Sequence, residues 1–307
     1  MRRLVFPLLL LFLFTARLAL AQADPEPKAP ADPQKFVLVP DASGNIPQEQ
    51  MRQLFRTVAD KDLENDKRLR DYTYIERDVE RHLDGKGQVK STETKTYEVM
   101  QVYGEQVNRL IAKDDKPLSE KDAAKEEEKI RKITEKRKNE SESDRRKREE
   151  KEAKDREEGH KFINEIADAY YFKLIGSDEV GGRETWVVDC EPRPDFQPHM
   201  KESKFLSKFR GRVWVDKNDV QLSKLDVEAL DNLTFGLFLA KLHKGAHFMM
   251  EQVRVNDEVW LPQHVIFNID ARLALLKEYR INGEQTFRDY KKFRSDSKIV
   301  GYEEVKQ

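Results

Sequence analysis

The stretch GRVWVDKNDVQLSKLDV, residues 211–227, decides the fold of this chain. Its first part alternates apolar and polar side chains with a period of two, which is the pattern of a half-buried β-strand. Asp216-Lys217-Asn218-Asp219 then supplies turn residues, and a second strand-like run follows over 220–227. So short a link permits only antiparallel pairing, because parallel neighbours need a crossover of about a dozen residues.

Strand-like runs recur on both sides of this hairpin, and short turn signals such as Asp84-Gly85-Lys86-Gly87 and Ile281-Asn282-Gly283 separate them. We therefore predict one large antiparallel meander of about eleven strands. A sheet of that size either closes or uses helices to cover its apolar face. Besides the hairpin, the predicted strands are 72–79, a run through Tyr97 to Tyr103, 106–112, 169–175, 185–190, 247–255, 259–268, 272–280 and 286–293.

Two segments have the spacing of amphipathic helices, with apolar residues at i, i+3, i+4 and i+7. The first follows Pro47, and the second follows Asp231-Asn232, which are good N-cap residues. We predict an α+β fold in which both helices lie across the sheet. The apolar residues are Met51, Leu54, Phe55 and Val58 in the first helix and Phe235, Phe238, Leu239 and Leu242 in the second.

Composition excludes several classes of function. The 307 residues are 38% apolar and 37% charged, which is typical of a soluble globular protein with surplus charge. Lys plus Arg total 57 against 58 Asp plus Glu, so the net charge of -1 argues against a dedicated nucleic-acid binder. The single cysteine, Cys190, excludes an intrachain disulfide and any multi-cysteine metal site.

The N-terminus has the layout of a secretory signal peptide. Arg2 and Arg3 precede an apolar run over 4–14, and Ala19-Leu20-Ala21 offers the small residues that signal peptidase accepts. A membrane anchor is the alternative, but Arg17 breaks the run and it falls short of about 20 apolar residues. We expect residues 1–21 to be removed, leaving a periplasmic or secreted protein without a transmembrane span.

The mature chain divides by composition. Residues 22–47 hold six of the twelve prolines and read as a flexible linker. Residues 119–158 carry 30 charged side chains out of 40, with no apolar periodicity, so we predict a solvated, partly helical insertion over 119–160. The half-sheet segments then comprise 48–118 and 161–295, and a tail covers 296–307.

This order of elements, together with Gly211-Arg-Val-Trp-Val-Asp216 and the later Val259-Trp-Leu-Pro262, resembles the periplasmic lipoprotein-carrier superfamily. That superfamily includes the lipoprotein-sorting proteins LolA and LolB and the sigma-factor regulator RseB. The resemblance spans roughly 48–293 apart from the charged insertion. It implies an unclosed β-barrel with helices over its concave face.

The resemblance also implies a function. We expect a non-enzymatic carrier, without a cofactor, that binds a lipid or the acyl chains of a lipoprotein in an apolar cavity. The alternative is a periplasmic protein-binding or envelope-stress scaffold of the same fold, which would contact an envelope protein through residues 119–158. Candidate cavity residues are Phe235, Phe238, Leu239, Leu242, Phe248, Met249, Met250, Trp214 and Trp260, although the sequence taken position by position favours ordinary core for most of them.

Catalytic and metal-binding patterns are weak. His243, His247 and Glu251 repeat at i, i+4 and i+8 and are the weak metal candidates, but Lys244 and Gly245 break the zinc-protease pattern. The chain contains no nucleophile elbow, phosphate-binding loop or dinucleotide fingerprint. The sequence therefore predicts neither a catalytic site nor a metal site.

Overall fold

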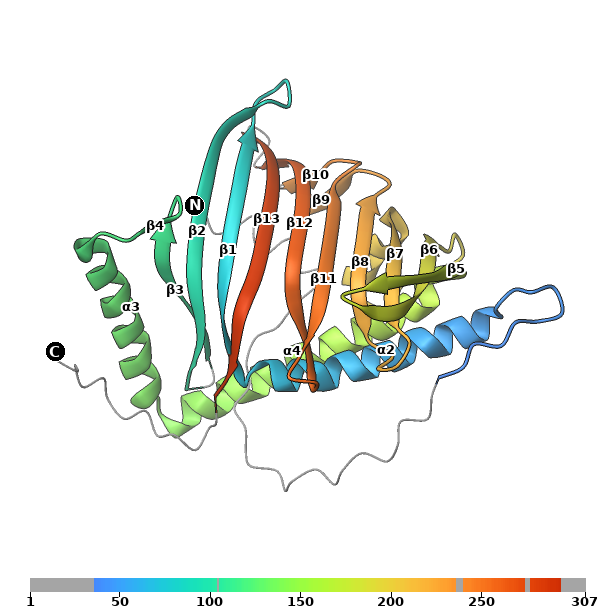
Figure 1. The fold of residues 1–307 in the computed structure, drawn as a ribbon, viewed down its shortest axis with the longest axis horizontal. Helices are drawn as coiled ribbons and strands as arrows, with labels where there is room; N and C mark the ends of the chain where they lie inside the picture. The colour runs from blue at the N-terminus through green and yellow to red at the C-terminus, as the bar shows by residue number, and fades with distance from the viewer. Residues whose placement is uncertain (1–35, 104, 236–239, 274–276, 294–307) are drawn as a thin grey trace.

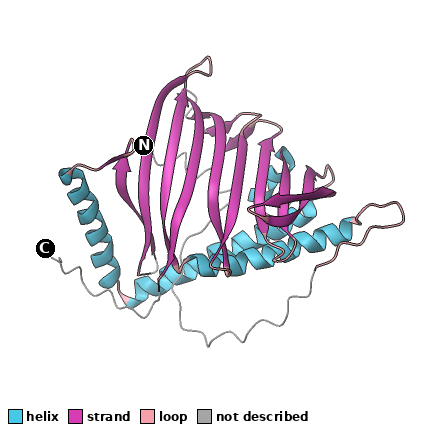
Figure 2. Ribbon diagram, in the orientation of Figure 1, coloured by secondary structure: helices cyan, strands magenta, loops and turns pink. Residues whose placement is uncertain are grey.

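The computed structural model describes residues 36–103, 105–235, 240–273 and 277–293 of the chain. They form an α+β fold with one antiparallel 13-stranded sheet, which confirms the fold class predicted from the sequence (Figures 1 and 2). The strands are β1 (Tyr72–Leu83), β2 (Val89–Val102), β3 (Glu105–Lys113), β4 (Lys116–Pro117), β5 (Tyr170–Val180), β6 (Arg183–Pro192), β7 (Phe209–Asp216), β8 (Leu222–Ala229), β9 (Leu233–Phe235), β10 (Ala240–Leu242), β11 (His247–Val255), β12 (Val259–Leu273) and β13 (Lys277–Lys292). The helices are α2 (Gln48–Leu69), α3 (Glu120–Lys138), α4 (Glu142–Ala169) and the short 3₁₀ helix η1 (Glu202–Lys208).

The main path of the sheet runs β4-β3-β2-β1-β13-β12-β11-β8-β7-β6-β5. Its two ends, β4 and β5, are not paired with each other, so the sheet does not close. Paired strands on this path are neighbours in the sequence except at two places, where β13 returns beside β1 and where β11 pairs with β8. The β7–β8 hairpin that the sequence predicts pairs with Val213 opposite Leu225.

Three local predictions are wrong. The predicted strand 272–280 spans the end of β12 and the start of β13, which are separate strands. The turn expected at 281–283 lies inside β13, because Gly283 pairs with Phe267 of β12 and the strand continues past it. The helix expected over 235–242 is contradicted at both ends. Residues 233–235 form β9 and 240–242 form β10, and β10 pairs with the upper part of β12. Backbone pairing along the edge of β12 outweighs the helical spacing of four apolar residues.

Helix α2 covers one end of the sheet with the apolar stripe that the sequence predicts. Met51 and Leu54 are fully buried, and the ring of Phe55 stacks on Phe172 of β5 with centroids 4.1 Å apart. These side chains pack against a cluster that includes Val188 of β6 and Val213 of β7. Burying one such apolar side chain stabilises the fold by about 1.5–3 kcal/mol, so this packing fixes α2 on β5–β8.

Amide side chains fix both ends of α2. At its start, Gln48 donates to the carbonyl of Phe172 (2.6 Å) and accepts from the Phe172 amide (3.0 Å). Near its end, Asn65 makes the same pair of bonds with the backbone of Trp260, at 2.5 and 2.6 Å. Because β5 is an edge strand, the Gln48 pair also caps backbone groups that would otherwise be open to another chain.

The charged segment forms α3 and most of α4, and polar contacts hold it. No residue of α3 is buried, and Lys129 Nζ donates to the carbonyl of Asn108 in β3 at 3.0 Å. Helix α4 runs beside α2 across the lower ends of the strands in Figure 1, and Arg56 pairs with its Asp168 at 3.0 Å. Among the described residues, no helix is long and apolar enough to cross a membrane.

Candidate functional site: the inner face of the sheet

Antiparallel partners in a sheet point to the same side, so the strand register defines two faces. We call inner the face on which α2 packs, and two rows of partners run across it. The first row is Leu174, Val188, Val213, Leu225, Met250, Val265, Gln285, Asp78 and Lys95. The second row is Phe172, Cys190, Gly211, Val227, Phe248, Phe267, Gly283, Glu80 and Glu93.

Both rows are apolar from β5 to β12, change at Gln285 and Gly283 on β13, and are charged on β1 and β2. The inner face therefore has an apolar half and a charged half. The apolar half is itself divided, because α2 packs its apolar stripe against the β5–β8 end and reaches β12 only near its own C-terminal end, at Trp260. Around β11, β12 and β13 a second cluster forms, and its described members include no residue of α2, α3 or α4, although Phe205 of the short helix η1 packs against it.

The second cluster, which we call the central cluster, is the candidate site. Its buried side chains are 8% exposed or less, and they come from the sheet and from the β9–β10 pair. Phe248 packs against it from the second row. The buried members are Ala229, Leu233, Leu242, Ala246, Met250, Val265, Phe267, Ile269, Ala271 and Ile281.

The structure brings together three of the nine cavity residues chosen from the sequence, namely Leu242, Phe248 and Met250. Met249 points to the opposite, outer face, since it pairs with Asp226 between two inner-face residues. Phe238 and Leu239 lie outside the described residues, and of Phe235 only the backbone in β9 is described.

Both tryptophan candidates lie apart from the central cluster. Trp214 is on the outer face, where its Nε1 donates to Asp178 Oδ2 at 3.0 Å and Lys224 Nζ lies 5.1 Å from its ring centroid. Trp260 is buried, and its Nε1 donates to Asp219 Oδ2 at 2.9 Å. These contacts tie loops and strands together rather than line an apolar surface.

Sequence reasoning missed most of the central cluster, including Val265, Phe267, Ile269 and Ile281. Period-two alternation in 259–273 and 277–283 was the available signal, since these residues occupy every second position. The supposed turn at 281–283 divided β13, which hid the fact that this strand shares one face with β12.

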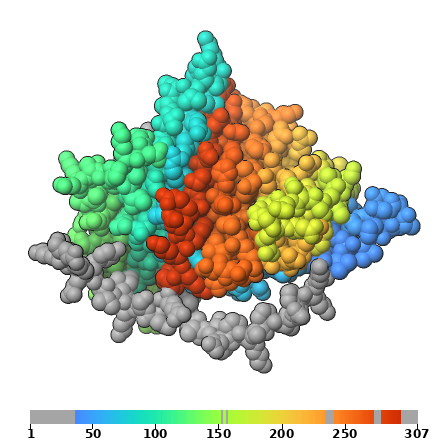
Figure 3. Space-filling view, viewed as in Figure 1, coloured from blue at the N-terminus to red at the C-terminus, as the bar shows by residue number. Residues whose placement is uncertain are grey.

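The outer face carries a ladder of ion pairs. Arg212 pairs with Asp189 at 2.5 Å, Lys224 with Glu251 at 2.7 Å and His247 with Asp226 at 2.8 Å. His247 and Glu251 thus have separate partners, and they do not join His243 in a group of metal ligands. In Figure 3, β13 and β12 (red and orange) lie uncovered by any helix on the side turned to the viewer.

The charged half of the inner face contains a buried carboxyl pair. Glu76 is 9% exposed, and Gln285 Nε2 donates to both Glu76 Oε1 (3.3 Å) and Asp78 Oδ1 (3.0 Å). Burial, with Asp78 close by, raises the pKa of Glu76 well above its usual range. Burial is also the main reason that the pKa of Asp78 rises to about 6. The pair therefore holds protons near neutral pH more firmly than exposed carboxyls do.

Comparisons with known proteins give structural likenesses only. No family model matches the chain, and no curated protein matches it. A LolA superfamily protein from Nitrosomonas europaea is 7% identical with a TM-score of 0.30, covering 82% of this chain and 97% of that one. A putative outer membrane lipoprotein-sorting protein domain from Vibrio parahaemolyticus is 12% identical with a TM-score of 0.32, covering 78% and 95%.

A DUF1329 family protein from Desulfovibrio piger is 12% identical with a TM-score of 0.27, covering 80% of this chain and 95% of that one. Identities and scores this low say nothing about what the present chain binds.

Proposed function

We propose that this protein is an exported, non-enzymatic carrier that binds an acyl chain, from a lipid or a lipoprotein, on the apolar half of its inner face. The observation that supports the proposal is the central cluster, where rows of apolar side chains meet and, among the described residues, none of the long helices α2, α3 and α4 contributes a side chain. Each buried CH₂ of a bound chain would contribute about 0.8 kcal/mol.

The cluster contains side chains suited to this task. Phe248 of β11 and Phe267 of β12 are cross-strand partners, so they lie side by side and supply a large apolar surface. Met250 lies in the next row, and its flexible thioether can repack around chains of different length. Its neighbours Leu225 and Val265 extend the row on both sides.

An entering chain has to displace part of the cluster, and β9 and β10 are the natural part to move. Each is three residues long, and among the described strands β9 pairs with β10 alone. Segments with few hydrogen-bonded partners open at low free-energy cost. A bound acyl chain would occupy the positions that Leu233 and Leu242 of these strands fill in the cluster.

A fluorescent fatty acid, cis-parinaric acid, tests the proposal, because its emission rises on transfer from water to a dry apolar site. Titration into the full-length mature chain is expected to saturate. Phe248→Asp places a charge on the inner face and is expected to weaken binding by about tenfold or more. Met249→Asp, the matched control one residue along the same strand, changes the outer face and is expected to bind as the unaltered chain does.

Circular dichroism spectra establish that both variants are folded. A folded unaltered chain that gives no saturable signal would contradict the carrier proposal and leave protein binding, the alternative that the sequence resemblance allows, as the better function. Equal losses in the two variants would show that the inner face is not the binding surface. Export is tested separately, by N-terminal sequencing of the protein recovered from a secreting host, which is expected to begin near Gln22.

A further inference from the structure

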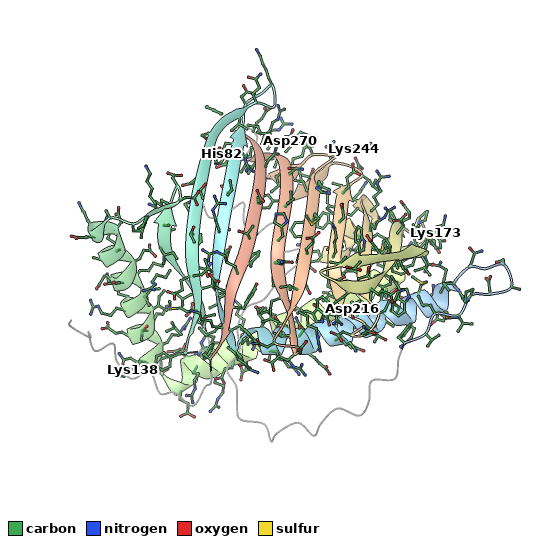
Figure 4. All side chains as sticks on the ribbon, in the orientation of Figure 1. His82, Lys138, Lys173, Asp216, Lys244 and Asp270 are labelled. Carbon is green, nitrogen blue, oxygen red and sulfur yellow. The ribbon has the colours of Figure 1, made fainter. Side chains whose placement is uncertain are left out.

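Three side chains with metal-binding atoms gather on the inner face near the upper ends of β1 and β2. They are Glu80 and His82 of β1 and Glu93 of β2, and one ligand atom from each lies within 4.8 Å of the other two. Among the residues that the structure describes, this is the one group of three such side chains. Figure 4 labels His82 at this end of the sheet.

The register of the hairpin produces this grouping. Glu80 and His82 are two residues apart on one strand, so their side chains leave the same face. Glu93 lies directly opposite Glu80 on the neighbouring strand. Both pairing and alternation are properties of backbone geometry, so the three donors come from rigid strands and not from a loop.

The group has two carboxylates and one nearby ammonium group, so its formal charge is negative when the imidazole is neutral. Directly opposite carboxylates on neighbouring strands destabilise a sheet unless a positive charge compensates them. Lys95 Nζ lies 2.9 Å from Glu93 Oε1, and His82 Nε2 lies 3.7 Å from Glu80 Oε2. Lys95 is also the cross-strand partner of Asp78, so one ammonium group serves several carboxyl groups on this face.

We propose that Glu80, His82 and Glu93 bind a divalent first-row transition metal ion, with Zn²⁺ as the preferred ion. One imidazole nitrogen and two carboxylate oxygens form a mixed donor set that suits Zn²⁺, whereas Mg²⁺ and Ca²⁺ prefer oxygen ligands alone. All three side chains are half-buried, so an ion can enter from solvent and keep a position for water. This site is independent of acyl-chain binding and lies outside the His243, His247 and Glu251 pattern.

Calorimetric titration of Zn²⁺ into the chelator-treated full chain tests the site. One ion per chain is expected, and excess Mg²⁺ is expected to leave the binding unchanged. His82→Ala is expected to weaken Zn²⁺ binding by about tenfold or more, which is the usual cost of disturbing a metal site. His264→Ala is the matched control. His264 also lies beside a carboxylate, 3.1 Å from Glu284 Oε1, with 28% of its side chain exposed against 32% for His82.

The His264→Ala variant is expected to keep the affinity of the unaltered chain. An unaltered chain that takes up no stoichiometric Zn²⁺, or a His264→Ala loss as large as that of His82→Ala, would overturn the proposal. Should His82→Ala fail to fold, Glu93→Gln replaces it, since the amide keeps the size of the side chain and removes its charge. Displacement of bound Zn²⁺ by Mg²⁺ at similar concentrations would also overturn the assignment to Zn²⁺.

Discussion

The ring of Phe267 lies directly over the backbone of Gly283, its cross-strand partner on the inner face. A Cβ atom built at position 283 would overlap three carbons of that ring, Cζ, Cε1 and Cε2. Glycine is therefore required at position 283 because the Phe267 ring leaves no room for a side chain, although the sequence pattern predicts a turn there. Phe267 thereby lies at the boundary between the apolar and charged halves of the inner face.

Gly283→Ala is expected to destabilise the fold by about 1–3 kcal/mol, the usual cost of overpacking a core. The added methyl group forces Phe267 out of its place in the central cluster. Urea unfolding measures the change in the free energy of unfolding. Gly176→Ala in β5 is the control, because a Cβ there meets no atom within 4 Å. An alanine tolerated equally at both positions would contradict the packing of this pair.

Asp216→Asn is expected to destabilise the fold by about 3 kcal/mol, because it removes the charge of one partner in a buried ion pair. The Asp216 carboxylate is fully buried and accepts from Arg183 at 2.6 and 2.9 Å. It also accepts from the amides of Asn218 and Asp219, at 3.0 and 2.7 Å, in the β7–β8 turn.

The control for this change is Asp189→Asn, which alters the Asp189–Arg212 pair that also joins β6 to β7. That pair lies in solvent on the outer face, so its loss is expected to cost less than about 1 kcal/mol. Thermal unfolding compares the two variants. Similar shifts in melting temperature would show that burial does not distinguish the two pairs.

Glu76→Gln is expected to raise the free energy of unfolding by about 1 kcal/mol or more at pH 8 and to leave it nearly unchanged at pH 4. Burial raises the pKa of Glu76 in the fold above that in the unfolded chain. Its contribution to stability is therefore complete below about pH 4 and is lost as the pH rises through the folded pKa.

Urea unfolding across this pH range measures the effect of the Glu76→Gln change. Glu98→Gln is the control, since Glu98 belongs to the neighbouring strand β2 but lies on the outer face, where it pairs with Arg109. A Glu76→Gln curve parallel to that of the unaltered chain would mean that the carboxyl is not buried against the inner face.

Asp62→Asn is expected to stabilise the protein at pH 7 while having little effect at pH 4. Burial raises the pKa of Asp62, a residue of α2 that faces Gln221, to about 6, and Asp66 nearby adds to the rise. Protonation therefore favours the fold, and this contribution disappears as the pH rises from about 4 through 6. Asparagine keeps an oxygen for the 3.4 Å contact from Gln221 Nε2.

Melting temperatures at pH 4, 5.5 and 7 measure the effect of Asp62→Asn. Glu64→Gln, on the exposed side of the same helix, is the control and is expected to show no such dependence on pH. A decrease in stability at pH 7 would show that the ionised carboxylate of Asp62 has a favourable partner.

The sequence alone determined the elements whose pattern is local. Period-two alternation and short polar links give antiparallel strands, and the spacing of Met51, Leu54 and Val58 gives α2, because both patterns depend on which side of one element faces the core. The β7–β8 hairpin also follows from its turn residues and alternation, whereas the register shift between Trp214 and Val215 does not.

Only the tertiary structure decided which strands lie side by side and which side chains share a face of the sheet. Pairing of β1 with β13, which brings Asp78 opposite Gln285, joins residues more than 200 positions apart, and no local pattern encodes it. The same long-range register put Phe267 over Gly283 and turned a predicted helix at 235–242 into two short strands on the edge of β12. Which side chains line the inner face is therefore a consequence of contacts between distant segments, whose free energies the local sequence does not contain.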